Sequence, residues 1–124
     1  MSDGEGNSDL ASDPVLLANL MDGLHYFVYF KDRESRFVRI NRAMTKRLGL
    51  ENPEEALGRT DFDFFDREHA QEALADEERI IATGESLRDK EELEVGPDGE
   101  RRWALRPKLP LRDAGGDIVG TFGY

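Results

Sequence analysis

Side chains able to carry out catalysis or to hold a metal ion are scarce in this sequence. The chain of 124 residues has two histidines, His25 and His69, and no cysteine. It contains neither an HExxH zinc motif nor a glycine-rich phosphate loop. The lack of cysteine removes disulfides, thiolate metal sites, cysteine nucleophiles and cysteine-linked flavin or thioester chromophores. We therefore expect no metal site, no catalytic residue and no enzymatic activity in this segment.

Aromatic and apolar side chains are better candidates for a binding site, because such side chains line small-molecule cavities. The ligand-pocket candidates are Tyr29, Phe37, Met44, Leu48, Phe62, Phe64, Phe65, Leu74, Trp103 and Leu105. The alternative is that they form only the core, since a domain of this size needs most of its large side chains to close one. Arg102, Arg106 and Lys108 would bind an anionic ligand if their face turned inward, but the alternation along their strand predicts that they face outward.

The charge of the chain argues against some classes of partner. There are 27 acidic and 17 basic residues, which give a net charge of −10, and they are spread along the chain. Because nucleic-acid binding depends on neutralising phosphates, we expect no nucleic-acid partner. No stretch approaches the roughly 20 consecutive apolar residues of a membrane span. We expect no membrane contact by this segment and a cytoplasmic location.

Two strands joined by a polar turn, and a helix directly after them, are the elements that position the first candidates. Each of the five residues of Tyr26–Phe30 is either aromatic or β-branched, which favours a strand. Phe37, Val38 and Ile40 favour a second strand for the same reason. The break at Lys31–Ser35 predicts a hairpin turn. Asn41 is suited to cap a helix over Asn41–Leu48, because its side chain can accept a hydrogen bond from the first helical turn. His25 opens the first strand and is expected to be a packed or half-exposed residue of the sheet.

A short amphipathic helix is predicted before the hairpin, after a disordered leader at residues 1–12 that has too few apolar side chains to order. Asp13-Pro14 fits a helix start, and apolar positions follow at helical spacing up to Gly23. Since both faces of Tyr26–Phe30 are apolar, something must cover the second face. Either this helix covers the sheet, or it joins two copies of the domain. The dimer-interface candidates are Leu16, Leu17, Leu20, Tyr26 and Val28.

The longest helix is predicted over Asp66–Thr83, where Gly84 ends it. Its apolar stripe is formed by Ala70, Ala73, Leu74, Glu77, Ile80 and Ile81. Three strands follow, over Leu87–Val95, Arg102–Leu111 and Ile118–Phe122, with glycine-rich turns between them.

Together with the first hairpin, these strands make five. Strands grouped on either side of a run of helices indicate an α+β fold with an antiparallel sheet. We expect one curved sheet that cradles the Asp66–Thr83 helix and buries Trp103 and Phe122.

Five sequence motifs occur in a recognisable order along the chain. They are Val28–Phe37 leading to Asn41-Arg42-Ala43, then Gly58–Phe65, Ala82–Glu85, Pro97–Trp103 and Asp113–Gly120. In this order they resemble the PAS domain family of bacterial and archaeal signalling sensors, from about Pro14 to the last residue. The resemblance implies a PAS fold, with a five-stranded antiparallel sheet and several short helices and one long helix on one face. It also implies a single domain over residues 13–124, which we expect to be truncated at or within its last strand.

The resemblance implies a sensory or signal-relay input domain of a larger protein of the histidine kinase, diguanylate cyclase or transcription-regulator type. Such a domain would sense a small ligand or relay a signal through a homodimer to an output domain of the same chain. One alternative is a ligand-free interaction and dimerisation module. Another is a haem-binding gas or redox sensor, because haem-binding relatives use a histidine from the long helix, here His69. His69 has charged neighbours, which favour a surface position instead. Non-covalent flavin is also compatible with the family, but no residue favours a particular cofactor.

Overall fold

The computed structural model describes residues 12–95 and 99–124. The predicted leader lies outside the described residues except for Ser12, and so does most of the turn at 96–99. The elements in chain order are α2 (Asp13–Gly23), β1 (Tyr29–Asp32), β2 (Phe37–Ile40), α3 (Arg42–Arg47), η1 (Pro53–Ala56), η2 (Asp61–Asp63), α4 (Arg67–Thr83), β3 (Glu91–Val95), β4 (Arg101–Leu105), β5 (Lys108–Arg112) and β6 (Ile118–Gly123).

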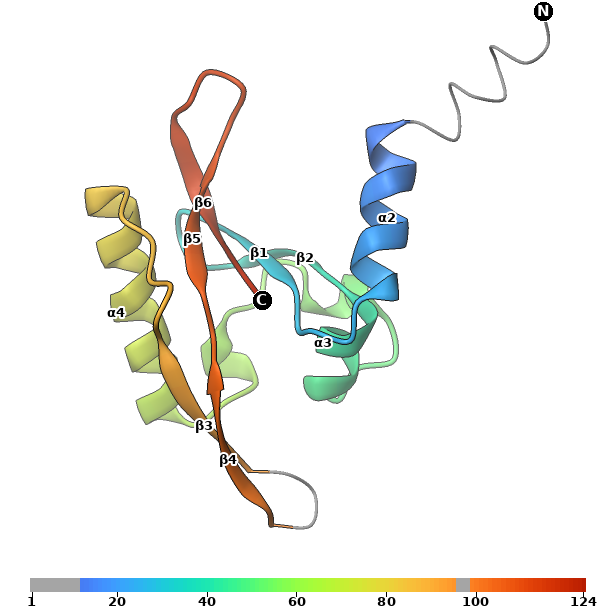
Figure 1. The fold of residues 1–124 in the computed structure, drawn as a ribbon, viewed down its shortest axis with the longest axis vertical. Helices are drawn as coiled ribbons and strands as arrows, with labels where there is room; N and C mark the ends of the chain where they lie inside the picture. Colours follow the sequence, from blue (N-terminus) through green and yellow to red (C-terminus); the bar gives the residue numbers. More distant parts are fainter. Residues whose placement is uncertain (1–11, 96–98) are drawn as a thin grey trace, which may run out of the picture.

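The first hairpin and the last two strands form one antiparallel sheet, in the order β2-β1-β6-β5. The long helix α4 contacts β5 and β6. Figure 1 shows α4 running alongside β5, whereas α2 stands on the other side of the molecule, next to α3. The α+β architecture with an antiparallel sheet is therefore confirmed.

The division of the strands differs from the expected single sheet of five. The predicted strand Arg102–Leu111 is interrupted at Pro107, because a proline has no N–H to donate to a ladder. The part before the break, β4, pairs with β3 in a separate two-stranded sheet. A bridge between Leu87 and Lys108, and a 2.7 Å hydrogen bond from the Arg106 N–H to the Lys90 carbonyl, link this hairpin to β5.

The exposure of Trp103 is a consequence of this division of the strands into two sheets. Trp103 pairs with Leu93 on the β3–β4 hairpin and is 68% exposed, so the expectation of a buried Trp103 is wrong. The hairpin extends beyond the four-stranded sheet (Figure 1), where the described residues provide no second layer to cover the indole. Phe122 is half-buried and stacks on Phe30, with ring centroids 5.6 Å apart.

The turn of the first hairpin is closed by Asp32. Its carboxylate accepts hydrogen bonds from the N–H groups of Glu34 and Arg36, and Ser35 takes a left-handed backbone conformation with φ of 62°. At its other end, β1 begins at Tyr29, three residues later than predicted. Tyr26 precedes the strand and is exposed.

Asn41 caps α3 as predicted and also joins three parts of the chain. Its Oδ1 accepts hydrogen bonds from the N–H groups of Met44 and Val28, while its Nδ2 donates to the carbonyls of Met21 and Tyr26. The residue is 1% exposed. These four bonds fix the end of α2 and the approach to β1 against the start of α3.

The apolar core lies between the sheet and the helices that cover it. Its buried centre is formed by Phe37, Ile40, Met44 and Ala56. Phe37 makes edge-on ring contacts with Tyr29 at 6.2 Å and with Phe64 at 6.0 Å. Because such contacts add about 0.5–1.5 kcal/mol to area burial, they help to fix the first hairpin against η2.

The long helix begins and ends where the sequence predicts. The Asp66 carboxylate accepts a hydrogen bond from the N–H of His69, and Gly84 ends the helix in the left-handed conformation with φ of 73°. Ala70, Ala73 and Ile80 are buried on the stripe that faces the sheet, and so is one charged residue, Glu77.

Candidate functional site

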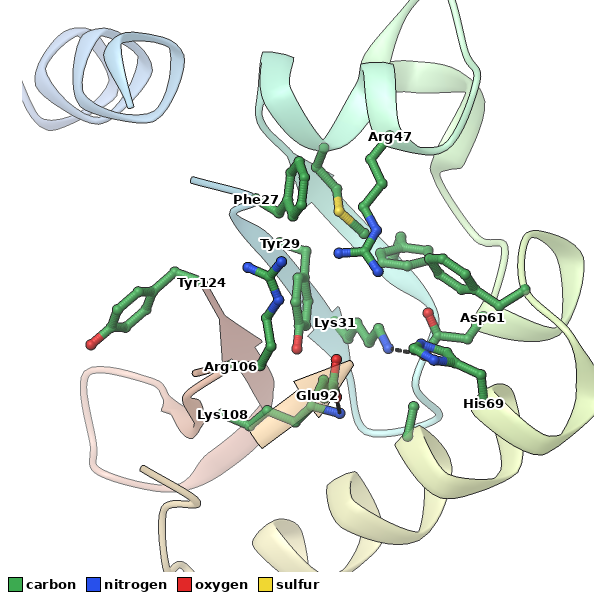
Figure 2. A pocket seen from close by; sticks show the side chains of 14 residues that line it. Phe27, Tyr29, Lys31, Arg47, Asp61, His69, Glu92, Arg106, Lys108 and Tyr124 are labelled. Carbon is green, nitrogen blue, oxygen red and sulfur yellow. Dashed lines mark hydrogen bonds and ion pairs between the residues drawn. The ribbon is translucent and has the colours of Figure 1, made fainter. Parts of the chain in front are cut away.

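A small cavity lies between the inner face of the sheet and the helices α3 and α4. Its volume is about 40 Å³. It is lined by Phe27, Tyr29, Lys31, Phe37, Met44, Arg47, Asp61, Phe65, His69, Ala73, Glu92, Arg106, Lys108 and Tyr124. Figure 2 shows Tyr29 and Lys31, from the strands, facing Arg47 and His69, from the helices, whereas the ring of Tyr124 points away.

Tyr29 forms the floor of the cavity at the junction of β1 and β6. Gly123 lies opposite it in the ladder, and a Cβ atom on Gly123 would overlap the phenol of Tyr29. Burial raises the pKa of Tyr29 well above its usual value, and the charges of Glu77 and Asp61 raise it further. The phenol therefore remains protonated and able to donate a hydrogen bond.

Lys31 is the buried cation of the site. It is 2% exposed, and its ammonium lies 2.6 Å from Asp61 Oδ2 and 2.7 Å from Glu77 Oε2. The same ammonium lies over the rings of Tyr29 and Phe37, at 5.1 and 4.9 Å from their centroids. We call Lys31, Asp61 and Glu77 the buried charge cluster. It joins β1, η2 and α4.

A second set of charges lies at the edge of the cavity that α4, β3 and β5 form. The Lys108 ammonium is 3.6 Å from Asp76 Oδ2 and 3.9 Å from Glu92 Oε1. Lys90 pairs with Asp76 at 3.2 Å and with Glu72. A hydrogen bond from Lys90 lowers the pKa of the Glu72 carboxyl. These pairs connect α4 to the start of β3 and to β5.

Arg47 and Arg106 meet over the ring of Phe27. Their guanidinium carbons lie 4.7 and 4.9 Å from its centroid, although the two residues come from α3 and from the β4–β5 junction. Burial lowers the pKa of Arg106, and the neighbouring charge of Arg47 lowers it further. Both groups carry a positive charge, because arginine side chains are not deprotonated in proteins.

Two basic residues therefore point inward against expectation. Arg106 and Lys108 line the cavity, and Lys108 is only 5% exposed. The prediction that they face outward is wrong because it assumed unbroken alternation, and the strand breaks at Pro107 between them. Arg102 lies on β4 and is exposed.

His69 also lines the cavity, with its ring against that of Phe65 at 4.5 Å. Pockets for drug-sized ligands measure about 300–1,000 Å³. The cavity is far smaller. These residues, as arranged, leave too little room for haem or flavin.

The structure distributes the predicted pocket residues over several environments. Tyr29, Phe37, Met44 and Phe65 line the cavity. Leu48 and Phe64 pack against the core behind it. Phe62, which is half exposed, lines a separate groove together with Leu74.

Trp103 and Leu105 require a correction, because both are exposed on β4 and neither lines the cavity. Of the dimer-interface candidates, Leu16, Leu20 and Tyr26 are exposed, Leu17 is half-buried and Val28 is buried.

The buried charge cluster was not predicted from the sequence. Lys31 falls in the predicted hairpin turn and Asp61 in the Gly58–Phe65 motif, and neither position indicates a buried charge. The available signal was Glu77, a carboxylate on the apolar stripe of the long helix, because a buried charge requires a partner of opposite sign.

The fold and the comparisons identify the family. A family model described as PAS fold matches residues 17–124, so the chain belongs to this family. No curated protein sequence matches it significantly.

Solved structures extend the comparison. A structure of VqmA bound to DPO is 29% identical, with a TM-score of 0.74, over 87% of this chain and 54% of that chain. A Vibrio cholerae VqmA dimer is 28% identical, with a TM-score of 0.76, over 90% and 49% of the two chains. The chain thus spans about half the length of the VqmA chains that it matches.

The comparisons overturn the expectation of no nucleic-acid partner. A complex of Vibrio cholerae VqmA with ligand and DNA is 28% identical to this chain, with a TM-score of 0.75, over 90% and 49% of the two chains. An RNA-binding light-oxygen-voltage receptor, 21% identical, has the same fold with a TM-score of 0.62, over 94% and 32% of the two chains. The acidic charge of one domain does not exclude nucleic acid as a partner, because another part of a longer protein can make the phosphate contacts.

The comparisons do not show the predicted kinase or cyclase context. Among the described residues, no helix is long and apolar enough to cross a membrane.

Proposed function

We propose that this PAS domain is a sensory input domain whose inner cavity binds a small molecule. The observation that carries the proposal is the lining of the cavity, where the rings of Tyr29, Phe37 and Phe65 meet the charges of Arg47 and Arg106. Aromatic walls with a few placed polar groups are the usual lining of ligand sites. The likeness to VqmA, which has been solved with DPO bound, supports the same assignment.

Ligand entry requires side-chain movement, because a cavity of about 40 Å³ is little larger than one water molecule. Arg47 and Arg106 are the side chains best able to move, since both are long and pack on the ring of Phe27. Their displacement would perturb α3 and the β4–β5 junction together. We propose that this movement is the signal.

For the output, we propose a transcription regulator in preference to a histidine kinase or a diguanylate cyclase. The support is the identity of 28–29% with VqmA, one of whose structures includes DNA. We propose that the segment itself acts by binding rather than by catalysis, and that the protein is cytoplasmic. Sequencing the gene beyond Tyr124 tests the output, and cell fractionation tests the location.

The cavity is tested by titrating the protein with DPO and then with a metabolite panel, by calorimetry and by amide chemical shifts. We expect a ligand that shifts the amides of β1, α3 and α4. Ala73, which is buried in the lining, is replaced by leucine to fill the cavity, and exposed Ala82 on the same helix is replaced by leucine as a control. Binding should be lost in A73L and kept in A82L. Equal binding by both variants, or no binder in the panel, would contradict the proposal.

A second candidate function is a ligand-free relay that works by dimerisation. The observation that favours it is the exposed apolar surface of Leu16 and Leu20 on α2, with Tyr26 nearby in the chain. One VqmA structure is described as a dimer, which is consistent with this candidate.

A further inference from the structure

A second hollow lies on the far side of the buried charge cluster from the inner cavity. It is a groove of about 220 Å³ between the first hairpin turn, η2 and α4. Phe62, Ala70 and Leu74 form its apolar part, and Glu34, Asp61 and Glu77 form its acidic part. Asp61 is the only residue that lines both this groove and the inner cavity, and both linings consist of described residues.

The charge of the cluster beside this groove is unbalanced. One ammonium, that of Lys31, faces two carboxylates, those of Asp61 and Glu77. All three residues are at least 93% buried. Among the described residues, Glu77 Oε1 has no hydrogen-bond partner, whereas Oε2 is bonded to Lys31. Leaving a buried acceptor unpaired is unfavourable, and more so when the group is charged.

The composition of the groove limits what can compensate this charge. No lysine, arginine or histidine lines it, so an anion would meet only like charge. In the part of the chain that the structure describes, no group of three or more histidine or acidic side chains is arranged to hold a metal ion. An organic cation with an apolar part satisfies both halves of the groove, because an ammonium group supplies three donors and no acceptor.

We propose that this groove binds a small primary ammonium ion with a short apolar substituent, whose ammonium pairs with Glu77 Oε1 and whose apolar part packs on Phe62 and Leu74. The site is separate from the inner cavity, and the proposal holds whether or not that cavity binds a ligand. Because Glu77 also holds Lys31 of β1, occupancy of the groove would act directly on the contact between α4 and the sheet.

The test uses benzylammonium as the probe and benzyl alcohol as its neutral analogue, each titrated by calorimetry and by amide chemical shifts. We expect benzylammonium to bind at least about tenfold more tightly than benzyl alcohol, which corresponds to about 1.4 kcal/mol. The amides of Thr60, Ala70 and Leu74 should shift, whereas those of β5 should not.

Variants separate a site at Glu77 from general attraction to an acidic protein. Glu77→Gln should weaken benzylammonium binding by at least about tenfold. The control Glu78→Gln, next to it on the exposed side of α4, should leave binding unchanged. If E77Q does not fold, Leu74→Trp decides, because it fills the groove without changing any charge of the cluster and should abolish binding. Equal affinity for the alcohol, unchanged binding by E77Q or L74W, shifts outside the groove, or no binding at millimolar probe would each overturn the proposal.

Discussion

Lys31 shows how one residue can determine both stability and the character of a site. A lysine with 2% exposure is rare unless it is paired, and here it has two carboxylate partners and two aromatic rings around it. Desolvating three charges is expensive, so the cluster adds little net stability compared with an apolar replacement. Its effect is specificity, since only one arrangement of β1, η2 and α4 satisfies it.

Lys31→Met should lower the free energy of unfolding by about 3–5 kcal/mol, because Asp61 and Glu77 would remain buried without a counter-charge. Replacing all three residues by apolar ones of similar size should recover most of that loss. Urea denaturation measures both effects, with Lys46→Met at an exposed position of α3 as the control. A K31M protein as stable as K46M would contradict the assigned role.

Because the pKa of Tyr29 is raised, we expect the protein to lose stability at alkaline pH. The pKa of Tyr29 in the folded protein is raised above the unfolded value of about 10, so the unfolded chain releases the phenolic proton first. The stabilising effect is therefore complete below pH 10 or so, and it is lost as the pH rises toward the folded-state pKa. Urea denaturation between neutral and alkaline pH should show a steeper decline for the wild type than for Tyr29→Phe. Parallel declines would show that the phenol is not shielded.

Among the secondary-structure elements, the sequence predicts best those helix ends that depend on neighbouring residues. The cap at Asn41 and the helix end at Gly84 involve residues close together in the chain, so the sequence predicts them well. The split of the predicted Arg102–Leu111 strand depends on which side of Pro107 finds a partner strand. Strand pairing is decided by tertiary structure, which the local sequence does not show. The inward orientation of Arg106 and Lys108 depends on this pairing.

The pairing of β1 with β6 yields a prediction at this scale. Gly123→Ala should force the Tyr29 ring to move, because the new methyl group would overlap its phenol and approach the Pro107 carbonyl at 3.0 Å. We expect a loss of about 1–3 kcal/mol in unfolding free energy, the usual cost of overpacking, and altered ligand binding in the cavity. Gly115→Ala is the control, since its Cβ would meet only Asp113 Oδ1 at 3.4 Å. Equal stability of the two variants would contradict the close packing of Tyr29 and Gly123.

Across the whole molecule, the charge is distributed unevenly. The chain carries a net charge of −10, yet four basic side chains and only two acidic ones line the inner cavity. Those lining residues are Lys31, Arg47, Arg106, Lys108, Asp61 and Glu92. Composition alone therefore could not predict the electrostatics of the site, because the average over the surface conceals a local excess of opposite sign.

The exposed face of α2 leads to a prediction about assembly. Replacing both Leu16 and Leu20 by glutamate should weaken self-association at least about tenfold, since burying two leucines contributes about 1.5–3 kcal/mol each. Sedimentation velocity over a range of concentrations measures the effect. Val119→Glu, which alters an exposed apolar residue of β6 rather than of α2, is the control. Monomeric wild-type protein at high concentration would contradict the interface, and so would equal weakening by the control.

The only tryptophan of the chain lies in water on the β3–β4 hairpin. Its indole fluorescence should therefore be red-shifted and open to quenching by acrylamide in the native domain already. A small molecule that enters the inner cavity beside Tyr29 would leave this emission almost unchanged. A titration without a change in fluorescence would therefore not be evidence against ligand binding. A shift to the blue would instead report that another polypeptide had covered the hairpin, which makes Trp103 a built-in probe of assembly rather than of sensing.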